Sequence, residues 1–87
     1  MKISRAERFK KDFLDLPGTV RKKVSKQITL LLIDHTHPSL RIEGIKGRQG
    51  IYSVRIDRQY RMALTFQGED TILLMRVLKH DDLYKSP

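Results

Sequence analysis

The stretch IYSVRIDRQYRMALTFQGEDTILLMRVLKHDDLY, residues 51–84, decides the fold of this chain. Apolar residues alternate with polar residues in three segments of it, and this period of two predicts β-strands. Polar turns at residues 57–59 and 67–70 separate the segments, and Gly68 favours the second turn. We therefore predict a three-strand antiparallel meander that is followed by a short polar tail.

The predicted sheet carries arginines on one of its faces. Matching the apolar residues of the three strands places Arg55, Arg61 and Arg76 together on the opposite side. Three like charges on one face repel one another unless an anion or an acidic partner lies among them. This face is our candidate for phosphate binding. The alternative is a set of ordinary surface ion pairs with carboxylates such as Glu43 and Asp57.

The first half of the chain has the periodicity of helices. Apolar residues recur every three or four positions over residues 5–16 and again over about 17–34. Ser4 and Glu7 have the spacing of a capping box, and Pro17 suits a first helical turn. Two helices joined by so short a turn form a helical hairpin. We expect the hairpin to pack its apolar sides on the sheet.

Three further segments complete the expected architecture. Residues 2–4 form either a first edge strand or a simple lead-in, and residues 39–45, SLRIEGI, alternate as a strand does. The loop at residues 46–50 offers Lys46 and Arg48 either to phosphate or to solvent. The expected fold is α+β, with an N-terminal strand and a helical hairpin packed on a curved antiparallel β-sheet.

Composition limits the function. Eighty-seven residues form one domain, residues 1–87, with a small core. Eighteen Lys and Arg against ten Asp and Glu give a net charge of +8, which favours a polyanionic partner such as nucleic acid or an acidic protein. The chain has no cysteine, no signal-peptide pattern and no apolar run near the roughly 20 residues of a membrane span. We expect a cytoplasmic protein that does not bind membranes.

The histidines suggest two kinds of chemistry. His35 and His37 form an HxH pair, but a metal site needs three or four convergent ligands and no further clear ligand group lies nearby in sequence. We therefore predict no metal site. His80 carries an imidazole, a group that can move protons. Tyr84 can donate a hydrogen bond or stack on a base. Each could equally belong to a solvated tail.

Four pieces of sequence, taken in order, resemble a known family. They are HPSLRIEGIKG at 37–47, IYSVRI at 51–56, YRMALTF at 60–66 and RVLKHDDLY at 76–84. With the layout above, the chain is similar over essentially its whole length to the RelE/ParE superfamily of bacterial and archaeal toxins. The resemblance implies the toxin of a type II toxin–antitoxin system, which a cognate acidic antitoxin holds inactive. RelE-like members are ribosome-dependent mRNA endoribonucleases, whereas ParE-like members poison DNA gyrase without catalysis.

The resemblance to RelE implies RNA cleavage without a metal or other cofactor. The ribose 2′-hydroxyl attacks the adjacent phosphate, and a 2′,3′-cyclic phosphate forms. This chemistry needs a base, an acid and positive charge at the phosphate. By motif, Arg61 matches the phosphate-stabilising arginine, and Arg55 matches a basic residue on the preceding strand. Tyr84 matches a C-terminal tyrosine that orients the nucleotide, and His80 is the candidate general acid.

The resemblance leaves the general base open. Ser53 stands where well-studied RelE proteins have lysine, and Arg55 stays protonated. Glu43, an aspartate of the Asp81–Asp82 pair, or the ribosome could take the proton. The remaining basic residues are expected to bind RNA phosphate: Lys46, Arg48, Arg76, Lys79 and Lys85. We therefore predict an mRNA endoribonuclease, with a ParE-like gyrase poison or a plain nucleic-acid-binding module as alternatives.

Overall fold

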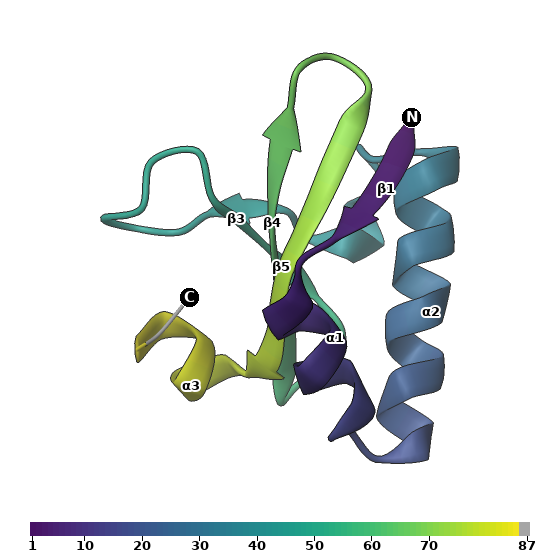
Figure 1. Cartoon of the computed structure of the whole chain (residues 1–87), viewed down its shortest axis with the longest axis vertical. Helices are drawn as coiled ribbons and strands as arrows, with labels where there is room; N and C mark the ends of the chain where they lie inside the picture. Colours follow the sequence, from purple (N-terminus) through teal and green to yellow (C-terminus); the bar gives the residue numbers. More distant parts are fainter. Residues whose placement is uncertain (86–87) are drawn as a thin grey trace.

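A computed structural model describes residues 1–85, and it has a five-stranded sheet with helices packed against it (Figure 1). In chain order the elements are β1 (Lys2–Arg5), α1 (Glu7–Leu14), α2 (Gly18–Ile33), the 3₁₀ turn η1 (Pro38–Leu40), β2 (Glu43–Gly44), β3 (Tyr52–Arg55), β4 (Tyr60–Gln67), β5 (Thr71–Lys79) and α3 (His80–Lys85). The strand order is β1-β5-β4-β3-β2. The predicted meander therefore forms the centre of the sheet. In the part of the chain described, no helix combines the length and the apolar character needed to cross a membrane.

The sheet is mixed rather than wholly antiparallel. Residues 2–5 form a true edge strand, which pairs in parallel with β5 and places Ile3 beside Ile72. Both strand pairs of the meander, β3 with β4 and β4 with β5, are antiparallel. The α+β class predicted from the sequence is confirmed, with this one parallel edge added.

The two predicted helices form, but the first begins differently from the prediction. α1 begins at Glu7 and has Ala6 as its N-cap, without a side-chain hydrogen bond. The predicted capping box is wrong because Ser4 belongs to β1, where its backbone pairs with β5. Phe9 of α1 and Val24 of α2 are buried in the main core.

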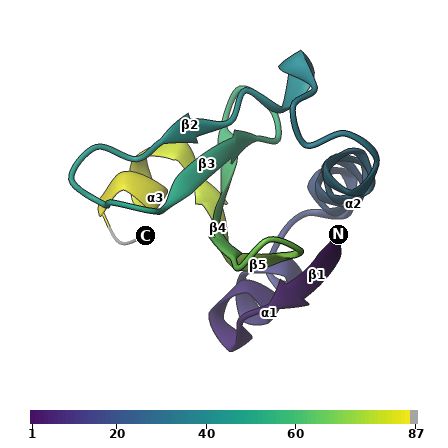
Figure 2. The same cartoon turned by 90° about the horizontal axis from the view of Figure 1, so that it is seen from above.

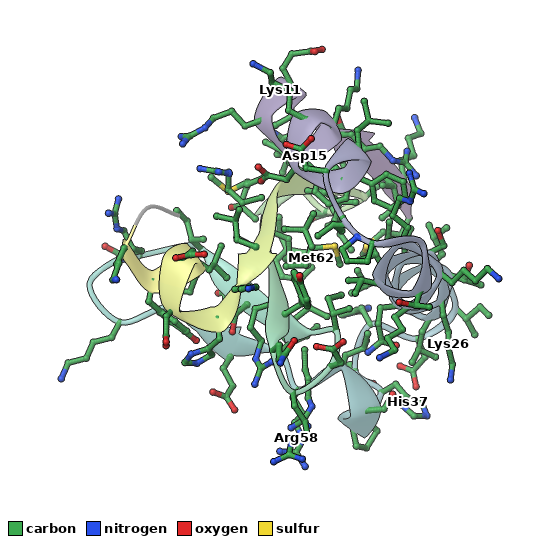
Figure 3. The ribbon with its side chains drawn as sticks, turned by 90° about the horizontal axis from the view of Figure 1, so that it is seen from below. Lys11, Asp15, Lys26, His37, Arg58 and Met62 are labelled. Carbon is green, nitrogen blue, oxygen red and sulfur yellow. The ribbon has the colours of Figure 1, made fainter. Side chains whose placement is uncertain are left out.

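An extra residue in β5 corrects the predicted alternation of that strand. Ala63 lies opposite Arg76, but Leu64 lies opposite Leu74, so Met75 is left as a β-bulge. The main core therefore receives Ile72, Leu74 and Val77. Regular alternation predicted that Leu73, Met75 and Val77 share the apolar face of this strand, opposite Leu74, Arg76 and Leu78. Figure 3 shows Met62 of β4 in the interior, near α2.

A second, smaller core forms on the other face of the sheet. Ile45, Ala63 and Leu83 are buried there. The predicted polar tail is wrong, because residues 80–85 form α3 and bury Leu83 completely against this face. Seen from above, α2 and α3 lie on opposite sides of β4 (Figure 2).

The segment at residues 39–45 is a strand over only two residues. η1 ends at Leu40 and is followed by Arg41, whose φ of 45° is left-handed, and β2 begins at Glu43. His37 caps η1, since its Nδ1 accepts the backbone N–H of Ser39 at 3.1 Å. The predicted longer strand is wrong because this turn changes the direction of the chain.

Asp57 holds the turn between β3 and β4. Its carboxylate accepts the backbone N–H groups of Gln59 and Tyr60, both at 2.8 Å, and pairs with Nζ of Lys23 on α2 at 3.1 Å. Burial works to raise the pKa of Asp57, but these three donors outweigh it. The pKa therefore lies below the ordinary value of 3.8.

We predict that Asp57→Ala lowers the free energy of unfolding by about 1–3 kcal/mol at neutral pH, because two backbone amides lose their acceptor. The folded-state pKa of Asp57 is below its unfolded-state pKa. The stabilisation is therefore complete above the unfolded-state value and is lost as the pH falls through the folded-state value. Urea denaturation should show wild type and variant converging in strong acid. The exposed Glu69→Ala variant is the control, and a pH-independent gap would contradict the prediction.

Candidate functional site

A concavity of about 100 Å³ opens where β2, β3, β4 and α3 meet. Its lining consists of Arg41, Glu43, Ser53, Arg55, Arg61, His80 and Tyr84. The structure therefore brings together all four predicted catalytic residues, from segments up to 29 residues apart in sequence (Arg55 to Tyr84). The lining also contains Glu43, which the sequence suggested as one possible general base.

Two arginines of the sheet, Arg55 and Arg61, have no ion-pair partner among residues 1–85. Arg55 and Arg61 lie directly opposite each other in the register of β3 and β4. Nη1 of Arg61 donates to the carbonyl oxygens of Tyr60, at 2.9 Å, and Asp57, so the turn orients this guanidinium. In the described part of the chain, neither they nor Arg41 form an ion pair. Like charges directly opposite one another destabilise a sheet, so this arrangement favours an anion between them.

A buried amide positions the segments that carry two of these arginines. Gln27 of α2 is only 8% exposed, and its Nε2 donates to the carbonyl oxygens of Arg55, at 2.8 Å, and Ser39, at 3.4 Å. It therefore ties α2 to both β3 and η1. Arg41 follows η1 in a left-handed backbone conformation, which is uncommon for a residue with a side chain. Arg41 was not predicted as a site residue, although its alternation with Glu43 was a usable signal.

α3 adds an imidazole and a phenol to the concavity. The rings of His80 and Tyr84 have centroids 4.6 Å apart. The hydroxyl of Tyr84 lies 3.4 Å from Oγ of Ser53, and Nδ1 of His80 lies 3.3 Å from Oδ1 of Asp81. Glu43 pairs with Ser53 in the register of β2 and β3 and is the one carboxylate in the lining. The site thus combines cations with groups that can accept and donate protons.

Arg76 is not part of this concavity, which corrects its predicted place among the arginines. Its Nε and Nη2 donate to the carboxylate of Asp12 on α1 at 2.7 Å and 3.1 Å. The two side chains are only 12% and 11% exposed. The same carboxylate accepts the backbone N–H of Val77 at 3.1 Å, at the edge of β5 that β1 no longer covers. The charge of Arg76 is therefore balanced by Asp12 inside the fold.

The other predicted phosphate-binding residues lie at different places. Lys79 lines a neighbouring concavity. Lys46 and Arg48 are exposed in the loop between β2 and β3, which projects from the body of the molecule (Figure 1), and Lys85 is exposed at the end of α3. These three line neither concavity. Their binding to RNA stays a prediction.

No known family model matches the sequence. The sequence is 33% identical over 91 residues to "Toxin RelE3" of Methanocaldococcus jannaschii, covering 97% of this chain and 96% of the relative. The structure is similar to the RelB-RelE antitoxin-toxin complex from Methanococcus jannaschii, with a TM-score of 0.77 and 30% identity, over 97% of this chain and 99% of that one. YafQ from E. coli strain BL21(DE3) shares the fold, with a TM-score of 0.76 and 13% identity over 95% and 97% of the two chains.

We predict that inorganic pyrophosphate binds in the concavity and raises the Tm of the protein, because the arginines there gain a counterion. A ligand at ten times its Kd stabilises the folded state by about 1.4 kcal/mol. Arg55→Gln should abolish most of the rise in Tm. Arg8→Gln removes the same charge from an exposed position on α1 and should leave the rise intact. Equal shifts in the two variants would refute the assignment.

Proposed function

The chain belongs to the RelE family of toxins, and we propose that it acts as an endoribonuclease that cleaves mRNA on the ribosome. One observation carries the proposal: Arg55 and Arg61 share a concavity with His80, Tyr84 and Glu43. Phosphodiester cleavage by an internal hydroxyl needs a base, an acid and positive charge at the phosphate, and these residues can supply all three. A gyrase poison without catalysis does not need this combination. The place of action is then the cytoplasm, where ribosomes and mRNA meet.

The arginines hold the scissile phosphate in this proposal. Negative charge grows on the phosphate oxygens as the 2′-hydroxyl attacks, and fixed positive charge stabilises that transition state more than the ground state. Arg61 is best placed for this role, because the carbonyl oxygens of Tyr60 and Asp57 fix its guanidinium before substrate binds. Arg55 and Arg41 supply further charge without competing ion pairs in the described chain.

Glu43 and His80 divide the proton transfers. Glu43 takes the proton of the 2′-hydroxyl, because it is the carboxylate that lines the concavity containing both Arg55 and Tyr84. Asp81 and Asp82 line only the neighbouring concavity. Protonated His80 gives a proton to the leaving 5′-oxygen. The contact of its Nδ1 with Asp81 leaves Nε2 for that transfer. Tyr84 orients the nucleotide with its ring or its hydroxyl.

A cognate antitoxin is the inferred protein partner. A similar toxin is known in a RelB-RelE antitoxin-toxin complex, and this chain carries a net charge of +8. An acidic antitoxin that placed carboxylates over Arg55 and Arg61 would neutralise the site and exclude RNA from it.

We predict that Arg61→Ala lowers the rate of mRNA cleavage on programmed ribosomes by about 100- to 1,000-fold, or about 3 kcal/mol of transition-state stabilisation. Arg61→Lys should fall in between, because it keeps the charge and loses the fork of donors. Primer extension on a single-turnover reaction measures the rate, and Arg8→Ala serves as the control for lost charge. Wild-type protein that leaves mRNA uncut in the presence of ribosomes would end the proposal.

We predict that Glu43→Gln lowers the cleavage rate by about 100- to 10,000-fold, the usual range for a general base. The remaining activity should lose the part of its pH dependence in which the wild-type rate falls towards acid. Glu69→Gln changes a carboxylate outside the concavity and should behave as wild type. If Glu43→Gln keeps the wild-type pH profile, the base is another group.

A further inference from the structure

A second concavity, of about 660 Å³, adjoins the proposed catalytic one. Its lining consists of Arg58, Gln59, Arg61, Lys79, His80, Asp81 and Asp82. Arg61 and His80 belong to both linings, so the two concavities meet at the pair of residues proposed to act on the scissile phosphate. The larger concavity is therefore open to a strand that is held at Arg61.

The larger concavity contains an arginine that the chain leaves uncompensated. Arg58 is exposed in the turn between β3 and β4, and its side chain forms no hydrogen bond or ion pair with residues 1–85. Figure 3 shows it pointing away from the body of the molecule. Its sequence neighbour Asp57 is occupied by Lys23 and by two backbone amides. The guanidinium of Arg58 is therefore available to an anion.

The walls of this concavity carry opposite charges. Arg58 and Lys79 come from the sheet side, whereas Asp81 and Asp82 come from the first turn of α3. A phosphate is attracted to the first wall and repelled by the second. This distribution of charge favours a strand whose backbone follows the turn that carries Arg58.

We propose that Arg58 binds the phosphate next to the scissile phosphate in the RNA substrate. This inference rests on the proposed function and adds a binding subsite to it. The arginine forms charge-assisted hydrogen bonds to an oxygen that takes no part in the reaction. The substrate then needs two consecutive phosphates, so a strand of at least three nucleotides is recognised where a dinucleotide is not.

The test combines a protein variant with a modified mRNA. Arg58→Gln should lower kcat/KM for cleavage on programmed ribosomes by about 10- to 100-fold, as expected for a lost charged hydrogen bond. An mRNA with a neutral methylphosphonate at one phosphate next to the cleavage site should cost the wild type a similar factor. Combining the two changes should cost no more than either alone, because both remove the same contact. Each of the two neighbouring phosphates is replaced in turn, and thermal unfolding verifies that the variant is folded.

Two results would overturn the subsite. The first is that Arg58→Gln cleaves as fast as the charge-matched Arg8→Gln. The second is that the decrease in kcat/KM caused by Arg58→Gln and the decrease caused by the methylphosphonate multiply when combined, at both phosphate positions. Arg58 would then contact another group, such as ribosomal RNA. Failure of the proposed function is seen separately, as wild-type protein that leaves unmodified mRNA intact. The same combination of variant and methylphosphonate, measured as affinity for a free single-stranded RNA, would then test the contact. The slope of log affinity against log salt concentration should be smaller by about 0.7 in the variant.

Discussion

The β-bulge at Met75 is the constraint on which the rest of the sheet depends. Side chains along a strand alternate between its faces, so a regular β5 that buried Ile72 and Leu74 would also turn Arg76 toward the main core. The extra residue shifts the alternation and lets Val77 enter that core instead. It also places Leu78 opposite Arg61, and so brings the end of β5, and with it α3, to the face that holds the concavity.

Positive charge is distributed unequally over this framework. Arg76 is paired with Asp12 and contributes to the joining of α1 and β5. Within residues 1–85, Arg55 and Arg61 face each other without such a partner, and Nη1 of Arg61 donates to carbonyl oxygens rather than to a carboxylate. The structure neutralises Arg76 but leaves Arg55 and Arg61 opposite each other. The repulsion between these two guanidinium groups is relieved when an anion binds between them. This difference distinguishes the site from a generally basic surface.

The sequence predicts correctly the elements that local periodicity of apolar residues defines. The meander and the helical hairpin follow from apolar periodicity, and Arg55 and Arg61 share a face because their strands alternate regularly. α3 was missed because so short a helix depends on tertiary contacts, such as the burial of Leu83 against the sheet. The bulge and the pairing of Arg76 with a residue 64 positions away depend on tertiary contacts that periodicity does not contain. Arg41 and Arg58 were missed because their places are set by turns.

The parallel pairing of β1 with β5 bears on the timing of activity during synthesis. Lys2–Arg5 have no strand partner until Thr71–Leu74 have been made. Arg61, His80 and Tyr84 also lie in the last third of the chain. Contacts between residues so distant in sequence form late and slowly, because the entropy cost of closing the loop comes before the favourable energy of the contact. A nascent chain therefore has neither its edge strand nor the concavity until β5 and α3 have been synthesised.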